Sequence, residues 1–432
     1  MPFLSEGMES REKNVLMIAY HFPPANMGSG HLRALGFVKY LPSLGWKPIV
    51  LTAHVKAYPR IDAASVELIP QACPVYRAFT LDARRHMGIR GKYPAFLAQP
   101  DRWISWWPAA VWQGLRLIRK YNIRVIWSTY PIMTAHCIAY TLSRLTGIPW
   151  IADFRDPVTS SVSLENRYAA SSQRRWEQRV VTRATHTVFT TPGAMQSYAE
   201  RYQQINREGQ LSVIPNGYDE ANFTGLPELM PCRPGRPLHL LHSGTLYVHG
   251  RNPGPFFIAL ANLQASGIVT ANDLRVTLRA SDYDAEYLNE ISRLDLNDIV
   301  VLAPPVSYQE ALVEQVNADA LLLFQGNQFN NQIPTKLYEY LRIGRPIFAL
   351  VDEHGDTATV LSNTGGAEIV PLNNVQTIEK RLLKFICAVR EGRALKADKK
   401  AVQRYSRHSG AVVLAGLLDR IASLRCANTD AL

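Results

Sequence analysis

The amino-acid sequence predicts an α/β protein built from two successive domains, each with a doubly wound parallel sheet. Short apolar runs alternate with amphipathic helical patterns along the chain, which is typical of parallel α/β units. The alternation stops once, in a segment rich in Pro and Gly at residues 216–237, and then starts again. The chain of 432 residues is also longer than one hydrophobic core usually organises.

The first domain is expected at residues 14–215. Apolar, β-rich runs predict its strands at Val15–Tyr20, Pro48–Thr52, Val125–Ser128, Trp150–Asp153, Thr187–Thr190 and Leu211–Ile214. Apolar residues at helical spacing predict its helices at His31–Leu44, Thr134–Thr146 and Arg174–Ala184. The stretch that follows the second strand, up to about Pro108, shows neither pattern and is expected to be irregular.

Residues 216–237 are expected to be a linker, and residues 238–395 the second domain. Its strands are predicted at Leu238–His242, Leu274–Arg279, Ile299–Leu302, Ala320–Phe324, Pro346–Val351 and Glu368–Val370, with the first helix at Pro255–Ala265. Residues 396–432 are expected to form a tail that ends in a helix. The apolar residues of that helix share one face: Leu414, Leu417, Leu418 and Ile421.

The bulk composition restricts the function classes. The formal net charge is +11 and the pI is about 9.4, which favours an anionic partner. Five scattered cysteines, none in a C-x-x-C pair, disfavour both a disulfide framework and a zinc site and fit a reducing cytoplasm. The N-terminal apolar run is too short for a signal-peptide core, and no apolar segment is long enough to span a bilayer. No motif of a nucleic-acid-binding fold is present, so nucleic acid is not the expected partner.

Two groups of residues follow predicted strands of the first domain. The loop that contains Gly28, Ser29 and Gly30 joins a strand to a helix, where backbone N–H groups can approach an anion. A plain strand-to-helix turn explains this loop about as well. A dinucleotide-binding loop fits poorly, because Arg33 stands in place of the third glycine and no acidic residue follows the second strand.

The second group is Asp153, Arg155 and Asp156. Three charged residues at the end of a buried parallel strand lie where α/β sheets bind ligands, and they predict a substrate site. The alternative is an internal Arg–Asp pair that fixes the loop.

The second domain carries two more candidate segments. Gly244 follows its first strand, and Arg251 precedes a helix, where a guanidinium group suits a diphosphate. Further along, Thr335 and Lys336 follow Pro334 at a predicted helix start, so that Lys336 and nearby N–H groups can meet an anion. Glu339, one turn later, could accept hydrogen bonds from both hydroxyls of a ribose; a solvated helix face is the alternative.

Taken together, these segments resemble the family-4 glycosyltransferases of the GT-B fold, from Val15 to the last helix. The carrying segments are Phe22-Pro23-Pro24 with Gly28, Gly30 and Arg33; Ala152-Asp153-Phe154-Arg155-Asp156-Pro157; Ile214-Pro215-Asn216-Gly217; Ser243-Gly244 with Arg251; and Pro334-Thr335-Lys336-Leu337-Tyr338-Glu339-Tyr340. The resemblance implies two facing Rossmann-like domains, with the C-terminal helix crossing back to the first one.

The resemblance also implies a function and roles for residues. A nucleotide-diphosphate sugar would bind mainly to the second domain and the acceptor to the first, with retention of configuration and without a metal or other cofactor. Glu339 would bind the donor ribose, Arg251 the diphosphate, and the Gly28–Gly30 loop would close over the phosphates. Asn331 stands where many relatives carry the first of two glutamates, and Arg155 replaces a histidine.

The predicted function is transfer of a sugar to a lipid-linked or surface-polysaccharide acceptor, in the cytoplasm or peripherally on the inner membrane face. Basic residues interleaved with tryptophan between Arg84 and Arg124 suit an anionic membrane surface, but tryptophans packed inside the domain beside a solvated basic face explain the pattern about equally well. These residues are Arg84, Arg85, Arg90, Lys92, Arg102, Arg116, Arg119, Lys120 and Arg124, with Trp103, Trp106, Trp107 and Trp112. The alternative functions are a sugar-nucleotide epimerase, a sugar-phosphate synthase or a non-catalytic sugar-nucleotide-binding protein.

Overall fold

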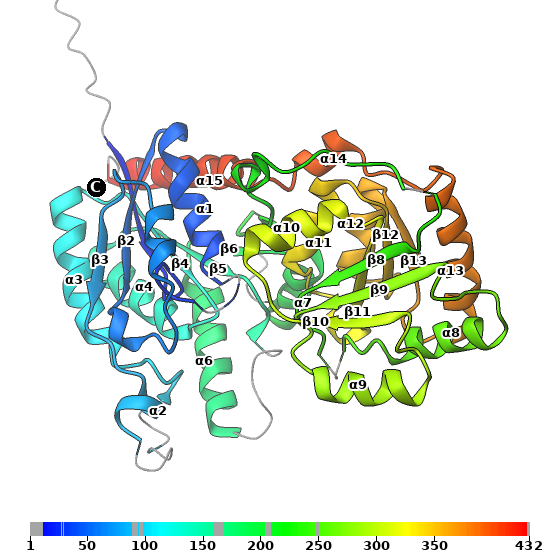
Figure 1. Cartoon of the computed structure of the whole chain (residues 1–432). Helices are drawn as coiled ribbons and strands as arrows, with labels where there is room; N and C mark the ends of the chain where they lie inside the picture. The colour runs from blue at the N-terminus through cyan, green and yellow to red at the C-terminus, as the bar shows by residue number, and fades with distance from the viewer. Residues whose placement is uncertain are drawn as a thin grey trace, which may run out of the picture. The chain divides into compact units, whose positions relative to one another are not determined.

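The computed structural model describes residues 12–26, 28, 30–88, 94, 98–158, 167–203, 209–232, 234–247 and 250–429. The chain forms two compact units (Figure 1). Unit 1 consists of Met1–Pro215 and Arg407–Leu432, and unit 2 of Asn216–Ser406. Within the described residues, no helix is both long enough and apolar enough to cross a membrane.

Unit 1 contains a seven-stranded parallel sheet in the order β3-β2-β1-β4-β5-β6-β7. Its strands are β1 (Lys13–Ile18), β2 (Trp46–Ala53), β3 (Val75–Ala78), β4 (Val125–Thr129), β5 (Trp150–Phe154), β6 (His186–Phe189) and β7 (Leu211–Val213). Its α-helices are α1 (Leu32–Tyr40), α2 (Ala83–His86), α3 (Trp106–Tyr121), α4 (Met133–Thr146), α6 (Arg167–Arg183), α7 (Pro192–Arg201) and α15 (Arg407–Thr429).

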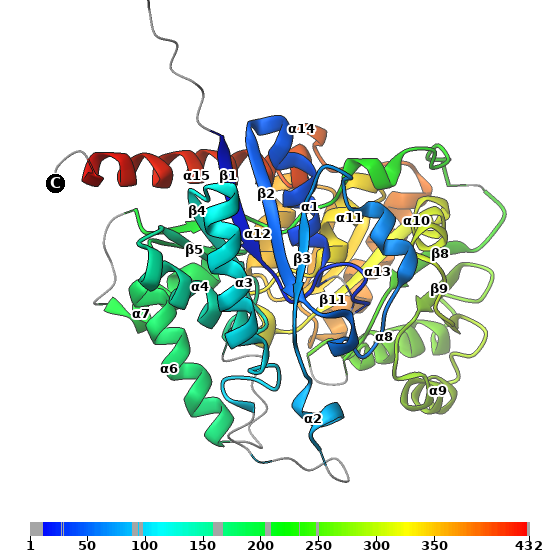
Figure 2. The same ribbon diagram turned by 90° about the vertical axis from the view of Figure 1, so that its left-hand side faces the viewer.

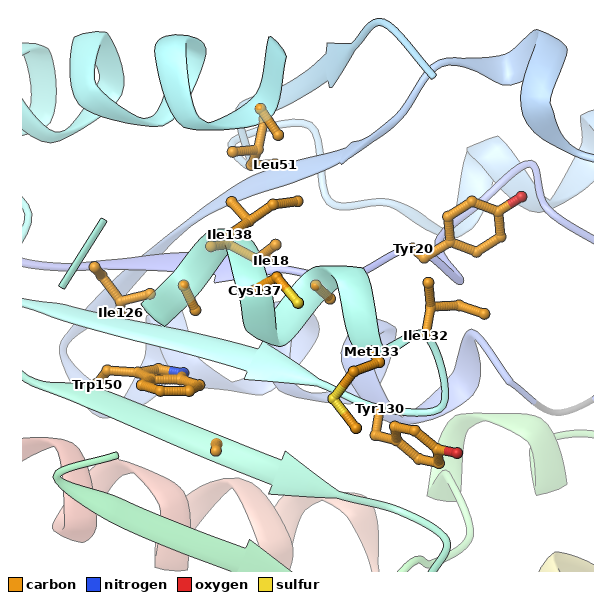
Figure 3. Packing of buried hydrophobic residues seen from close by; sticks show 14 of the residues in the cluster. Ile18, Tyr20, Leu51, Ile126, Tyr130, Ile132, Met133, Cys137, Ile138 and Trp150 are labelled. Atoms are coloured by element: carbon orange, nitrogen blue, oxygen red, sulfur yellow. The ribbon is translucent and has the colours of Figure 1, made fainter. Parts of the chain in front are cut away.

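Successive residues of the central strands of unit 1 point to opposite faces of the sheet, as the pleat requires. In β1, Leu16 and Ile18 pack under α3 and α4, whereas Val15 and Met17 pack under α1 and α15. Figure 3 shows the first of these two cores, where Ile18, Ile126 and Trp150 meet α4. Both faces of the sheet are therefore buried, which explains the continuous apolar runs in the sequence.

Unit 2 contains a six-stranded parallel sheet in the order β10-β9-β8-β11-β12-β13. Its strands are β8 (Leu238–Ser243), β9 (Leu274–Arg279), β10 (Val300–Ala303), β11 (Ala320–Gln325), β12 (Ile347–Val351) and β13 (Ala367–Val370). Helices α8 (Gly254–Ala265), α9 (Asp284–Arg293) and α13 (Val375–Arg390) pack on one face. Helices α10 (Tyr308–Asn317), α11 (Thr335–Ile343), α12 (Asp356–Thr364) and α14 (Lys399–Gln403) pack on the other.

The prediction of an irregular stretch up to about Pro108 was wrong in three places. Residues 75–78 form the edge strand β3, which pairs with β2, Ala83–His86 form the short helix α2, and α3 already begins at Trp106. β3 has only four residues and three of them are half-buried, so it lacks the continuous apolar run of a central strand.

The segments at the two ends of unit 2 can be assigned to one unit or the other. Residues 216–237 belong to unit 2, where Tyr218 and Phe223 pack into its core. In the tail, α14 belongs to unit 2, whereas α15 belongs to unit 1 and packs against α1. The apolar face of α15 that lies in this core includes Leu414, Leu418 and Ile421.

Candidate functional site

A cluster of polar side chains lies in unit 2 where β8 and β11 end and α11 begins. The two strands are neighbours and parallel, so their carboxyl ends lie at the same edge of the sheet. This is the edge at which open α/β sheets bind ligands. The cluster contains Arg251, Lys336 and Glu339, all of which the sequence had singled out, together with His242 and Gln325, which it had not.

His242 is the buried centre of this cluster. Its Nε2 lies 3.0 Å from Lys336 Nζ and 2.9 Å from the carbonyl oxygen of Gly244, and its Nδ1 lies 2.9 Å from the carbonyl oxygen of Leu322. Burial, followed by the charge of Lys336, holds the pKa of His242 well below its ordinary value, so the ring is neutral at pH 7. A neutral ring has one N–H, and a Lys336 ammonium beside Nε2 favours the tautomer that carries it on Nδ1.

Lys336 lies in the first turn of α11 and is half-buried. Burial, and after it the charge of Arg251, lowers the pKa of Lys336 to about 7, although Glu339 acts in the opposite direction. Lys336 and Arg251 are thus held close together, and Glu339 only partly offsets the repulsion between them. An anion placed between them and the N-terminus of α11 would relieve this repulsion.

Arg251 is held by aromatic rings and one hydrogen bond. Its guanidinium carbon lies 5.1 Å from the ring centre of Tyr247 and 5.4 Å from that of Phe329. Nη2 donates to Gln325 Oε1 at 3.3 Å, whereas the buried Nε has no hydrogen-bond partner within the described part of the chain. Burial lowers the pKa of Arg251. A buried guanidinium N–H without a partner loses hydration, which a ligand oxygen could replace.

The neighbours of Arg251 and Lys336 are fixed by hydrogen bonds. Gln325 Nε2 donates to the carbonyl oxygens of Phe329 and Gln332, at 3.2 and 2.6 Å, and to Thr357 Oγ1 at 3.0 Å. This amide group therefore has one orientation, with Oε1 toward Arg251.

A hydrogen bond ties helix α11 to the end of β8. The backbone N–H of Ser243 donates to the hydroxyl of Tyr340 at 2.9 Å. Glu339 is 8% exposed and accepts a hydrogen bond from the Tyr308 hydroxyl at 2.8 Å. The carboxylate is thus held on the same helix as Lys336, one turn further on.

Gly244 leaves room for the Lys336 side chain. It has φ of +106°, in a region that side chains with a Cβ rarely adopt, and a Cβ there would lie 2.9 Å from Lys336 Nζ. Thr335 is the first residue of α11 and is half-buried, as is Asn331 in the loop before it. The structure therefore brings Gly244, Arg251, Lys336 and Glu339 together; their roles in binding a donor stay predictions.

Asp153, the first charged residue of the group in unit 1, is fully buried and pairs with Arg33. Arg33 Nη2 lies 2.7 Å from Asp153 Oδ1 and Nε 2.9 Å from Oδ2, and Thr129 Oγ1 also donates to Oδ2, at 2.8 Å. Arg33 Nη1 donates to the carbonyl oxygen of Pro215 at 3.1 Å. An internal Arg–Asp pair, which the sequence analysis left open as an alternative, therefore exists. Its arginine is Arg33 and not Arg155.

Arg155 lies at the same end of the sheet. Its Nη1 donates to the carbonyl oxygen of Gly30, while its buried Nε lacks a hydrogen-bond partner among the described residues. Burial is the first cause of a lowered pKa for Arg155, and the half-buried Asp156 acts against it. Gly28 has φ of +66°. Ser29 lies outside the residues that the structure describes.

His21 is a residue of this region that the sequence did not single out. Both of its ring nitrogens are buried without a hydrogen-bond partner in the described part of the chain. Burial and then the charge of Arg155 lower the pKa of His21 to about 3. A histidine that follows a buried strand is common enough that its position alone gave no functional signal. Catalytic roles for Asp153, Arg155 and Asp156 stay predictions.

The described residues contain no group of three or more His, Cys, Asp or Glu side chains that could hold a metal ion. The cysteines with described side chains are unpaired: Cys73, Cys137, Cys232 and Cys387.

Comparisons with known proteins relate this fold to a class of enzymes. Residues 30–217 match the family profile of a glycosyl transferase 4-like domain. A search of curated proteins found no significant match to the sequence.

Solved structures share the fold over nearly the whole chain. Sucrose-phosphate synthase from Thermosynechococcus elongatus has a TM-score of 0.66 at 14% identity, over 95% of this chain and 100% of its own. Anabaena HepE, in complex with UDP-glucose, has a TM-score of 0.56 at 14% identity, over 97% and 100%. The lipopolysaccharide outer core galactosyltransferase WaaB has a TM-score of 0.57 at 13% identity, over 93% and 99%. Residues 30–217 therefore form a glycosyl transferase 4-like domain, and the chain is a glycosyltransferase with the GT-B fold.

Proposed function

We propose that the chain transfers a glycosyl group from a nucleotide-diphosphate sugar whose diphosphate binds at Arg251 and Lys336. The observation that carries this proposal is the pairing of two poorly compensated cations beside the N-terminus of α11. A diphosphate is the part of such a donor that both cations and a helix N-terminus favour. Glu339 would accept hydrogen bonds from the ribose, on the side of α11 where Tyr308 already holds it.

The same groups would assist the chemical step. When the bond between the sugar and the diphosphate breaks, negative charge grows on the leaving diphosphate. Arg251, Lys336 and the N–H groups of α11 would stabilise this charge from fixed positions, without a metal ion. Lys336 has a lowered pKa in the free site, so binding of the anion would also raise the fraction of Lys336 that is protonated.

Unit 1 would bind the acceptor, which we propose to be lipid-linked or part of a surface polysaccharide on the cytoplasmic side of a membrane. Asp153 is a positioning residue in this proposal, because Arg33 and Thr129 already engage both of its carboxylate oxygens. Arg155 and Asp156 are the better candidates for substrate contact. The buried Nε–H of Arg155 has no hydrogen-bond partner among the residues that the structure describes, and Asp156 is half-buried. WaaB, which shares the fold, is a lipopolysaccharide outer core galactosyltransferase. Retention of configuration belongs to the same proposal.

The first test is calorimetric titration of the protein with UDP, GDP and ADP. UDP is the first choice because HepE was solved with UDP and with UDP-glucose. One nucleotide should bind, and Glu339→Ala should weaken it by ten- to a hundredfold, as expected when hydrogen bonds of about 1.5 to 3 kcal/mol to a charged group are lost. Glu286→Ala, an exposed glutamate on α9, should leave binding unchanged. Absence of binding by all three nucleotides would refute the donor site.

The product then distinguishes the alternatives. Transfer from the bound sugar nucleotide to a lipid-linked acceptor supports the proposal. Transfer to a free sugar phosphate, with no lipid present, would instead identify a sugar-phosphate synthase. Tight nucleotide binding without hydrolysis or transfer to any acceptor would identify a non-catalytic binding protein, in keeping with Asn331 at the position of the first glutamate.

A further inference from the structure

Helices α3, α4 and α6 form one layer on the outside of unit 1, although they are far apart in the sequence. Figure 2 shows them side by side, on the part of unit 1 that faces the viewer. Trp107 of α3 packs edge-on against Trp176 of α6, with ring centres 5.3 Å apart, and Tyr140 of α4 contacts the same Trp176 ring. Trp107 Nε1 also donates to Thr141 Oγ1 of α4 at 3.0 Å. This aromatic cluster holds the three helices together.

The outer side of α6 carries only positive charge. Its exposed side chains recur at helical spacing and include four arginines: Arg174, Arg175, Arg179 and Arg183. The single acidic residue between Ser171 and Arg183, Glu177, is fully buried and accepts from Arg201 at 2.6 Å. No carboxylate of α6 is therefore available to neutralise the arginines.

The other two helices continue this charge. α3 exposes Arg116, Arg119 and Lys120, α4 exposes Arg144, and neither helix contains an acidic residue. Among the described residues, none of the eight exposed cations of this layer forms an ion pair with a carboxylate. The net charge of +11 is thus concentrated, in part, on one face.

Two large apolar side chains project from the same layer. Trp112 of α3 is 62% exposed, and the guanidinium carbon of Arg116 lies 4.7 Å from its ring centre. Leu145, in the last turn of α4, is 64% exposed. An exposed indole beside arginine suits the boundary between lipid headgroups and acyl chains, where both parts are stabilised.

The structure also changes which residues belong to this surface. The sequence suggested the continuous segment from Arg84 to Arg124 for such a surface, with packed tryptophans as the alternative. Trp103 and Trp106 are in fact buried against Tyr20 in the core. Arg90 and Lys92 lie outside the described residues. Much of the charge comes instead from α6 and α4, which the sequence had not connected with α3.

We propose that the layer formed by α3, α4 and α6 binds an anionic lipid bilayer. Charge complementarity supports an anionic bilayer as the partner, because the eight exposed cations of this layer would face negatively charged headgroups. Trp112 and Leu145 favour a bilayer over a nucleic acid, because a bilayer offers them an apolar phase. The proposal is independent of the donor site in unit 2, which lies in a different part of the chain.

The test is co-sedimentation of the whole protein with vesicles of phosphatidylcholine, either pure or with a third of phosphatidylglycerol. The protein should bind the anionic vesicles much more tightly than the neutral ones, and higher salt should weaken binding because it shortens the Debye length. Each arginine near an anionic membrane strengthens binding by about fivefold, so R174Q/R175Q/R183Q should weaken it by about a hundredfold. Adding Trp112→Ala to this triple variant should weaken vesicle binding further.

The matched control is K380Q/K384Q/K399Q, which removes the same charge from exposed lysines of unit 2. This variant should bind anionic vesicles within a few-fold of the unaltered protein. Equal loss in both triple variants would show that total charge, not this layer, drives binding and would overturn the proposal. So would binding of a 20-nucleotide single-stranded DNA but not of vesicles. Titration of the same variants with nucleotide separates loss of membrane binding from failure of the donor site, because the donor site lies in unit 2.

Discussion

The pKa of Lys336 makes a sharp prediction about how donor binding depends on pH. Lys336 is half-buried beside Arg251, and loss of hydration followed by the charge of Arg251 lowers its pKa to about 7 in the free site. A bound diphosphate favours the protonated amine and raises the pKa again. The protonated form therefore binds the donor more tightly, and affinity falls as pH rises through the free-site pKa.

The magnitude follows from this free-site pKa. The protonated fraction of Lys336 drops from about 0.9 at pH 6 to about 0.03 at pH 8.5 if the pKa is about 7. If the bound complex stays protonated over this range, the Kd of the donor should rise by about thirtyfold, equivalent to about 2 kcal/mol. Binding near pH 8.5 should take up about one proton from solution for each donor bound.

The assay is calorimetry with the intact sugar nucleotide at several pH values, in buffers of different ionisation enthalpy. An intact donor is preferable to the free nucleotide, whose terminal phosphate titrates near neutral pH. Lys336→Met should bind more weakly at pH 6 and show no pH dependence in this range. Lys384→Met, which changes an exposed lysine on α13, should behave like the unaltered protein. A Kd that is constant with pH in the unaltered protein, or an equal slope in Lys336→Met, would refute the reasoning.

Three further predictions concern single side chains. Arg251→Gln should weaken binding of the sugar nucleotide by ten- to a hundredfold at an unchanged melting temperature, because it removes a charged hydrogen-bond group worth about 1.5 to 3 kcal/mol. A lower melting temperature with unchanged binding would contradict this. Arg33→Ala should lower the free energy of unfolding by roughly 3–5 kcal/mol, because it leaves buried Asp153 without its cation. Urea denaturation measures this loss, and Arg33→Met combined with Asp153→Asn should recover part of it. His136 is fully buried, and burial lowers its pKa to about 3. It stays neutral in the folded state while the unfolded state gains a proton below about pH 6.5, so stability is full above that pH and declines as pH falls toward 3. The loss between pH 7.5 and pH 5 should be smaller in His136→Gln by about 2 kcal/mol; equal losses in the two proteins would contradict the pKa.

The fold could be predicted from the sequence because both faces of each sheet are covered. A strand buried on both faces reads as an unbroken apolar run, as in Leu321–Phe324 of β11, which has no exposed residue. The edge strand β3 lacks this signal, since three of its four residues are half-buried and its pairing with β2 supplies its stability. Edge strands depend on neighbours that local sequence does not show.

The candidate site was predictable only in part, for a similar reason. Arg251 follows Gly250 before α8, and Lys336 lies two residues after Pro334 at the start of α11, with Glu339 one turn further on; sequence patterns have meaning at such element starts. His242 lies within an apolar run, and its role depends on Lys336, 94 residues away. In unit 1, the partner of Asp153 is Arg33, 120 residues away, and not the adjacent Arg155. Such long-range pairings depend on the fold and leave no local trace.

The return of α15 to unit 1 has a consequence for synthesis on the ribosome. Unit 2, Asn216–Ser406, is continuous, so all of its residues are synthesised before α15 is made. Unit 1 buries Leu414, Leu418 and Ile421 in its core and so lacks one side of that core until α15 has been made. The second half of the chain should therefore reach its native state before the first, the reverse of the usual N-terminal-first order. Nascent unit 1 meanwhile exposes the apolar residues that α15 later covers, which makes it the part most in need of a chaperone.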